Sequence, residues 1–188
     1  MLSDVLQEKN EQDSASEGKL AVKPFEQSVA LCGPAALKIL LSYFKKDFSE
    51  EQLAALADAT IEDGVEHEGL IQAAKALDAY VFAKDGGSID ELRYFVKEEK
   101  LPVIFGWFDT VNKGRPGDHY SVVVNVTDKN VIIVDPATNE PERWLSIENF
   151  PGIWFDFVGK DNKVVTWGWY MVVSFERKKF KVKGGHYY

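Results

Sequence analysis

The sequence has a single cysteine, so no disulfide can form within the chain, and a lone thiol is kept more easily in a reducing compartment. No apolar run approaches the roughly 20 residues that a membrane-spanning helix needs. The chain starts Met-Leu-Ser-Asp-Val, without the basic start and the apolar stretch of a secretory signal peptide. These absences predict a cytoplasmic protein with no membrane span.

Positive charge and histidine are also scarce. The net charge of -8 argues against nucleic acid as a partner, because nucleic-acid binding calls for a clustered basic face. Three histidines and one cysteine, widely separated along the chain, form no recognisable structural metal site. We therefore expect no nucleic-acid partner and no metal or organic cofactor. The oligomeric state stays open.

The chain of 188 residues is long enough for one domain with a real core, and it contains no repeat or long linker. Residues 1–23 are polar and predict a mobile or loosely docked arm. Residues 24–176 then form the domain. Residues 177–188 hold five basic and no acidic residues, whereas the rest of the chain holds 17 basic against 30 acidic ones. This contrast predicts a basic tail that is weakly attached to the domain.

Helix signals precede strand signals along the chain. Apolar residues recur at helical spacing over 33–45 and 69–79, and Ser49 and Ser88 each open a capping box. The later segments are rich in Val, Ile and aromatic residues and are separated by turn residues; they are 102–107, 120–126, 131–134 and 164–175. Helices first and strands second predict an α+β fold with an antiparallel sheet.

Cys32 stands at or just before the predicted start of the first helix, ahead of Gly33 and Pro34. A helix N-terminus favours a negative charge, and the thiolate is the nucleophilic form of cysteine. The small residues that follow leave room for a substrate backbone. The other interpretation is a buried core cysteine, and Cys32 alone does not decide between the two.

A cysteine nucleophile needs a base and an orienting carboxylate. His119 precedes a Val-rich strand and lies beside a loop, whereas His67, between two glutamates, suits a solvated surface position. Asp135 ends the strand 131–134, and a hairpin turning near residues 128–130 would bring it to the same sheet end as His119. Gln27 lies five residues before the cysteine, and its amide could donate to an oxyanion.

Together these segments resemble a known family. The runs Gln-Ser-Val-Ala-Leu-Cys-Gly-Pro-Ala-Ala-Leu at 27–37, His-Tyr-Ser-Val-Val-Val at 119–124 and Val-Ile-Ile-Val-Asp-Pro at 131–136 are similar to the bacteriocin-processing peptidases. Members of that family are papain-like cysteine peptidase domains, usually attached to peptide-exporting ABC transporters, and they remove leaders after a Gly-Gly pair. The likeness covers roughly residues 24–140. No Walker-type ATP-binding motif occurs, so a free-standing relative is expected.

The resemblance implies a papain-like fold in which Cys32 is the nucleophile, His119 the base, Asp135 the orienting residue and Gln27 the oxyanion donor. A peptide or protein is then the substrate, and cleavage after Gly-Gly is one option. Two alternatives stay open at this point: an acyltransferase or amidase that uses the same triad, and a catalytically silent peptide-binding module. The tail contains Gly184-Gly185, which also raises self-processing as the weaker of two interpretations.

Overall fold

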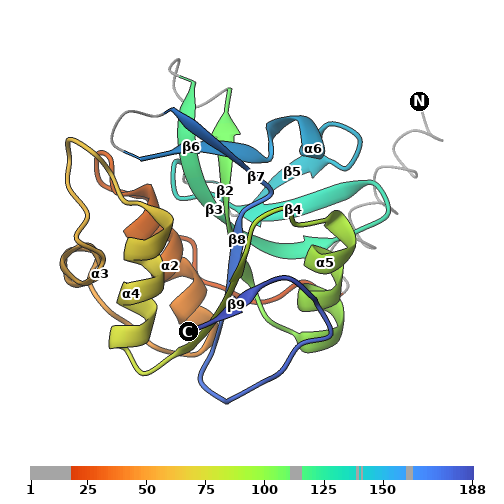
Figure 1. The fold of residues 1–188 in the computed structure, drawn as a ribbon, viewed down its shortest axis with the longest axis horizontal. Helices are drawn as coiled ribbons and strands as arrows, with labels where there is room; N and C mark the ends of the chain where they lie inside the picture. Colours follow the sequence, from red (N-terminus) through yellow and green to blue (C-terminus); the bar gives the residue numbers. More distant parts are fainter. Residues whose placement is uncertain (1–17, 111–115, 139, 141, 160–162) are drawn as a thin grey trace.

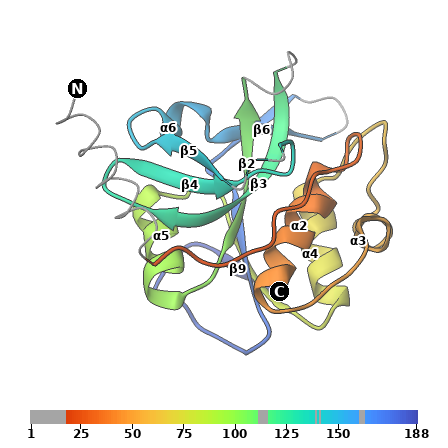
Figure 2. The ribbon, with the colours of Figure 1, turned by 180° about the vertical axis from the view of Figure 1, so that it is seen from behind.

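The computed structural model of the protein describes residues 18–110, 116–138, 140, 142–159 and 163–188. Three N-terminal helices lie together on one side of an antiparallel sheet, and a further helix lies on its other side (Figure 1). Seen from behind, the three N-terminal helices again lie on one side of the sheet and the further helix on the other (Figure 2). The predicted α+β class, with helices first and an antiparallel sheet second, is confirmed.

Three helices begin within one residue of the positions that the sequence indicates, and α4 begins two residues before the predicted segment 69–79. The three N-terminal helices are α2 (Cys32–Tyr43), α3 (Glu50–Ala57) and α4 (His67–Ala76). Ser49 and Ser88 form complete capping boxes, and they start α3 and α5 (Ile89–Tyr94). A π-helical turn, η1 (Phe95–Glu99), continues α5. The face of α2 that meets the sheet is fully buried, which matches its predominantly apolar sequence.

The main sheet has seven strands in the order β5-β4-β3-β2-β8-β1-β9. The strands are β1 (Tyr80–Lys84), β2 (Val103–Asp109), β3 (Gly117–Val126), β4 (Asn130–Val134), β5 (Arg143–Ser146), β8 (Tyr170–Ser174) and β9 (His186–Tyr187). All neighbouring pairs are antiparallel. Central strands β2, β3 and β8 are almost wholly buried, so their near-continuous Val and aromatic runs face packed elements on both sides.

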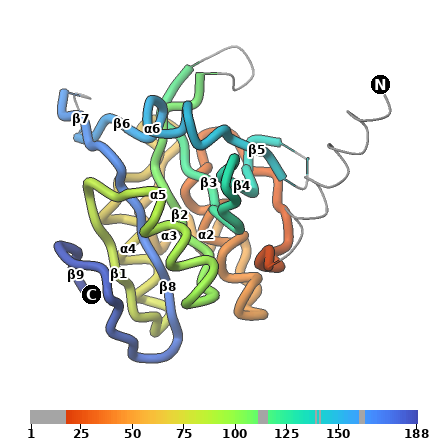
Figure 3. The backbone as a smooth tube through the Cα atoms, turned by 90° about the vertical axis from the view of Figure 1, so that its right-hand side faces the viewer, coloured from red at the N-terminus to blue at the C-terminus, as the bar shows by residue number. Residues whose placement is uncertain are grey.

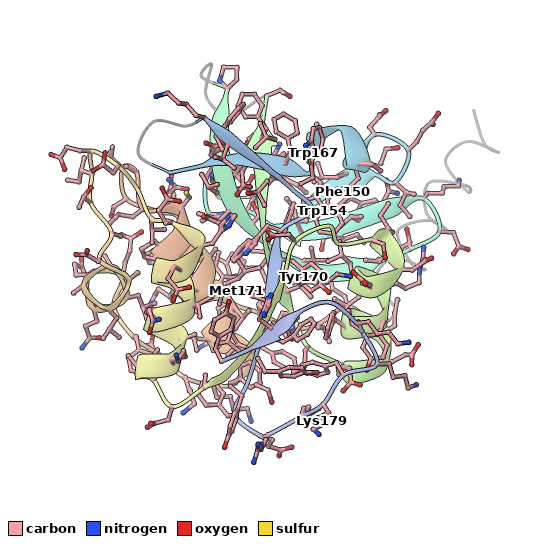
Figure 4. The ribbon with its side chains drawn as sticks, in the orientation of Figure 1. Phe150, Trp154, Trp167, Tyr170, Met171 and Lys179 are labelled. Atoms are coloured by element: carbon pink, nitrogen blue, oxygen red, sulfur yellow. The ribbon has the colours of Figure 1, made fainter. Side chains whose placement is uncertain are left out.

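The segment 164–175, predicted as one strand, is two strands in different sheets. Gly168 breaks it with a positive φ of 65°, and β7 (Val164–Trp167) pairs with β6 (Phe155–Val158) in a separate hairpin. The short helix α6 (Phe150–Ile153) leads into that hairpin. Figure 4 shows Phe150 and Trp154 beneath it, Tyr170 and Met171 at the centre of the sheet on β8, and Trp167 on the hairpin itself, where it is exposed.

The described end of the N-terminal arm is docked onto the domain, while residues 1–17 lie outside the described part of the chain. The backbone N–H of Leu20 donates to the carbonyl of Val124 at 3.0 Å, and the Leu20 side chain is buried. The backbone N–H of Lys23 donates to Ser42 Oγ at 2.7 Å. This segment therefore runs along β3 and α2.

The expectation of a weakly attached C-terminal tail is wrong. Strand β9 pairs with β1 at the edge of the main sheet, on the side away from β4 and β5 (Figure 3). The Phe82 ring lies 4.9 Å from Tyr187 and 5.5 Å from Phe180 between centroids. The charge count missed this packing because the tail alternates its lysines with apolar residues such as Phe180 and Val182, which pack against the core.

Within the described ranges, none of the helices combines the length and the apolar character that crossing a bilayer requires.

Candidate active site

Cys32 is the first residue of α2 and is half-buried. Leu31 occupies the N-cap, where it provides no side-chain acceptor, and the first turn contains no acidic residue. The first backbone N–H groups of a helix have no partner within the helix, and here no capping side chain supplies one. The amide and dipole of this helix start are therefore directed at whatever lies beside the thiol.

Gly33 allows close packing next to the thiol. A Cβ at this position would lie 2.2 Å from Val65 Cγ1, which is too close unless Val65 moves, and 3.4 Å from Tyr120 Cδ2. The hydroxyl of Tyr120 donates to the carbonyl of Val65 at 3.2 Å. The glycine after the cysteine thus lets the loop before α4 and strand β3 close against the start of α2.

His119 and Asp135 meet through strand register. Strands β3 and β4 pair Val122 with Val134, so one further step places Asp135 opposite Ser121, diagonal to His119. Diagonal neighbours on one face of an antiparallel pair are within reach of long side chains. His119 Nε2 lies 2.6 Å from Asp135 Oδ1, and both side chains are buried. The structure therefore brings His119 and Asp135 together at one end of the sheet, as the sequence predicts.

Cys32 is the second neighbour that acts on the His119 imidazole: its hydrogen bonding and its charge both raise the pKa of His119, so the imidazole stands between the nucleophile and the carboxylate. Because Nε2 faces Asp135, Nδ1 is the ring nitrogen that remains for the sulfur. Burial favours the neutral imidazole, but the hydrogen bonds to Asp135 and Cys32 and the charge on both outweigh it and raise the pKa of His119 to about 10. An imidazolium beside a thiol favours the thiolate.

Asp135 is held as a carboxylate. Burial opposes its ionisation, but the hydrogen bond and charge of His119 outweigh burial and lower the pKa of Asp135 below its ordinary value, with help from Arg143. The backbone N–H of Ala137 donates to Asp135 Oδ1 at 2.9 Å. The carboxylate therefore faces a cation on each side, and it fixes the imidazole ring.

Arg143 and Asp109 are charged neighbours of this pair that the sequence interpretation missed. Arg143 Nη1 pairs with Asp135 Oδ2 and lies 3.2 Å from Asp109 Oδ2. A signal existed for Asp109, which follows the apolar run of β2, but not for Arg143, because β5 (Arg-Trp-Leu-Ser) was not among the predicted strands. Nothing in the sequence indicated that these strand ends lie on either side of β3 and β4.

Gln27 is anchored beside the pair through its backbone. Its N–H donates to the carbonyl of Pro136, the residue after Asp135, at 2.8 Å. Its side-chain Nε2 lies 3.4 Å from the carbonyl of Ser28, while Oε1 is buried and finds no hydrogen-bond partner among the described residues. The structure thus places Gln27 next to the Asp135 turn with one amide atom unsatisfied.

The expectation that His67 is a solvated surface residue is wrong. His67 Nε2 lies 2.6 Å from Asp156 Oδ2, and Asp156 is only 2% exposed. The imidazole stacks on Trp169 at 3.9 Å between ring centroids. A Cβ at Gly106 would overlap Asp156 Oδ2, so the glycine makes room for the pair. The flanking glutamates suggested solvent, but β6 supplies a buried partner 89 residues later.

Comparison with solved structures supports the predicted papain-like fold of this chain. The peptidase domain of Streptococcus ComA matches with a TM-score of 0.62 at 19% identity, covering 84% of this chain and 99% of that one. A C39-like peptidase from Bacillus anthracis matches with a TM-score of 0.61 at 19% identity, covering 83% of this chain and 96% of that one. The predicted fold class is confirmed.

Comparison of sequences identifies the family. The chain is 34% identical over 123 residues to the pediocin PA-1 transport/processing ATP-binding protein PedD of Pediococcus acidilactici. The match covers 65% of this chain but only 16% of that relative. The sequence model of the Peptidase C39 family matches residues 25–158, which is more than half of the chain. The predicted resemblance and enzyme class are thereby confirmed, and the chain belongs to the peptidase C39 family of cysteine peptidases.

Proposed function

We propose that this chain hydrolyses a peptide bond with Cys32 as nucleophile, His119 as base and Asp135 as the orienting carboxylate. The observation that carries the proposal is the position of His119, which is buried, is hydrogen-bonded to Asp135 and has its pKa raised by the neighbouring Cys32 as well as by Asp135. A nucleophile, a base and an orienting group in contact are the arrangement that thiol-mediated acyl transfer requires.

The steps follow from these positions. The Cys32 thiolate attacks the carbonyl carbon, and the carbonyl oxygen becomes an oxyanion at the start of α2, where the Cys32 N–H can donate to it. Protonated His119 gives its proton to the departing amine as the C–N bond breaks, which leaves a thioester. Neutral His119 then takes a proton from water, the resulting hydroxide attacks the thioester, and the thiolate leaves again.

Gln27 is the proposed second oxyanion donor. Its Nε2 carries two N–H donors and makes one long contact of 3.4 Å to the carbonyl of Ser28, so an N–H of the amide is left to donate to the substrate. A substrate oxyanion would satisfy that donor. The backbone hydrogen bond to Pro136 keeps the residue beside the catalytic pair.

The proposed substrate is a peptide with a Gly-Gly pair before the scissile bond. The support is similarity: another matching structure, with a TM-score of 0.59 at 20% identity, is described as a double glycine motif protease in complex with the leader peptide. It covers 85% of this chain and 95% of that one.

The test uses synthetic peptides that carry Gly-Gly in an otherwise constant sequence, with mass spectrometry of the products. Wild type and the exposed control Lys179→Ala are expected to release the fragment that ends in Gly-Gly, whereas Cys32→Ala releases none. A parallel reaction with added amine separates hydrolysis from acyl transfer, because transfer gives an amide instead of the free acid. Binding without any product from the wild type would contradict the proposal and favour a silent peptide-binding module.

A further inference from the structure

The carboxylate of Asp135 is one member of a longer buried array of charges. One of its oxygens faces His119 and the other pairs with Arg143, which comes from β5. The same guanidinium nitrogen of Arg143 lies 3.2 Å from Asp109 Oδ2, at the end of β2. Asp109 and Asp135 are both 1% exposed, so water screens neither charge effectively.

An aromatic ring fixes where the guanidinium can lie. The Arg143 guanidinium lies 5.2 Å from the centroid of the Trp107 ring, and that ring lies 5.9 Å from the imidazole of His119. Trp107 Nε1 donates to Ser121 Oγ at 3.1 Å, which fixes the indole in turn. The arginine is therefore confined between an aromatic face and two carboxylates, on the side of Asp135 away from the imidazole.

The charges around Asp135 determine whether it can act. His119 from β3 and Arg143 from β5 pair with Asp135 directly. Asp109 from β2 acts on Asp135 through Arg143, and Cys32 from α2 acts on it through His119. Without Arg143, Asp135 would lose the cation that faces its second oxygen, while the buried carboxyl of Asp109 would remain nearby. A nearby like charge and loss of a countercharge both favour the protonated acid. A protonated Asp135 no longer favours the imidazolium that supports the thiolate.

We propose that Arg143 is a positioning residue of the catalytic pair, holding Asp135 ionised and oriented toward His119, and that Asp109 competes with Asp135 for the same guanidinium. The proposal rests on the proposed function, since it assigns Arg143 a role only through the imidazole and thiol that carry the reaction. It predicts opposite effects for the two partners. Removing Arg143 weakens the His119–Asp135 pair at low pH, whereas removing the charge of Asp109 leaves Asp135 as the carboxylate partner of Arg143 among the described residues.

The experiment measures the rate at which iodoacetamide alkylates Cys32, the only cysteine, as a function of pH by intact mass. Below some pH the rate falls as the thiolate–imidazolium pair is lost, and this acidic limb is the readout. Arg143→Met is expected to move the limb to higher pH by about one unit, which is about a tenfold slower reaction at a fixed pH on the limb. Arg93→Met is the matched control, because Arg93 pairs with the exposed Asp90 on α5, and it should leave the limb unchanged.

Asp109→Asn is expected to move the limb to lower pH, and it decides the question even if Arg143→Met fails to fold. In an Asp135→Asn background, Arg143→Met should produce no further shift. A limb that does not move in Asp109→Asn, or moves in the same direction as in Arg143→Met, overturns the proposal. If His119→Ala itself leaves alkylation unchanged, the proposed function fails; if His119→Ala slows alkylation but neither partner moves the limb, only the role of Arg143 fails.

Discussion

Phe180, in the C-terminal segment, is expected to contribute measurably to stability. It is partly buried against the core, and its ring centroid lies 5.0 Å from Phe95 and 5.5 Å from Phe82. Phe95 and Phe82 are themselves at most 1% exposed. Truncating Phe180 to alanine therefore removes contacts from two core rings and opens a route for water to reach them.

The size of the effect follows from the degree of burial. A fully buried Phe→Ala change costs about 3–5 kcal/mol, so a ring that is partly buried should lose about half of that, or roughly 2 kcal/mol. For a chain of this length, each kcal/mol lowers the melting temperature by about 2–4 °C, which gives roughly 4–8 °C for Phe180→Ala. Ending the chain at Glu176 should cost more, because it also removes the β9 pairing and Tyr187.

The assay is thermal unfolding followed by circular dichroism, with Lys179→Ala as the control. Lys179 is the neighbouring residue, is exposed and lies on the outer loop before β9 (Figure 4). The control should melt within about 1 °C of wild type, because surface substitutions usually change stability little. If Phe180→Ala and Lys179→Ala melt alike, the tail is independent of the core and the packing argument is refuted.

Three further predictions concern Gln27, His67 and His119. Gln27→Ala should lower turnover by about 10²-fold with little change in KM or in the alkylation rate, and an unfolded variant would instead make Gln27 structural. His67→Ala should destabilise the fold by roughly 1–3 kcal/mol in denaturant unfolding, because it leaves buried Asp156 without its partner; no loss would contradict that. The pKa of His119 is raised from 6.5 to about 10, so the stability that its charge contributes is complete below pH 6.5 and is lost as the pH rises toward 10. The pKa of Asp135 is lowered from 3.8, so the stability that its charge contributes is complete above pH 3.8 and is lost as the pH falls. The decrease in melting temperature caused by His119→Ala should therefore be largest between pH 3.8 and pH 6.5, and a decrease that is constant across pH would contradict the ion pair.

Local signals predicted much of the fold. Capping boxes at Ser49 and Ser88 and the apolar periodicity after Cys32 reproduce the starts of three helices, because helix ends depend on residues close in sequence. The hairpin between β3 and β4 was likewise readable from its short turn, and it brings His119 to Asp135. These features needed no knowledge of distant contacts.

Distant partners were beyond the reach of such signals. His67 looked solvated because its sequence neighbours are glutamates, but its environment is set by Asp156 and Trp169 from the other half of the chain. Arg143 was overlooked because its role depends on the order of strands in the sheet. The tail was misjudged because composition weighs its five charges and not the places where its aromatic rings dock.

The most direct test of the central claim is the alkylation rate of Cys32 by iodoacetamide at about pH 6, compared between wild type and His119→Ala. If Cys32 and His119 form a thiolate–imidazolium pair, the wild type should react at least about tenfold faster than the variant. Circular dichroism and melting of both proteins establish that the variant is folded. Equal rates in the two proteins, both matching a free peptide thiol, would show that Cys32 is not an activated nucleophile.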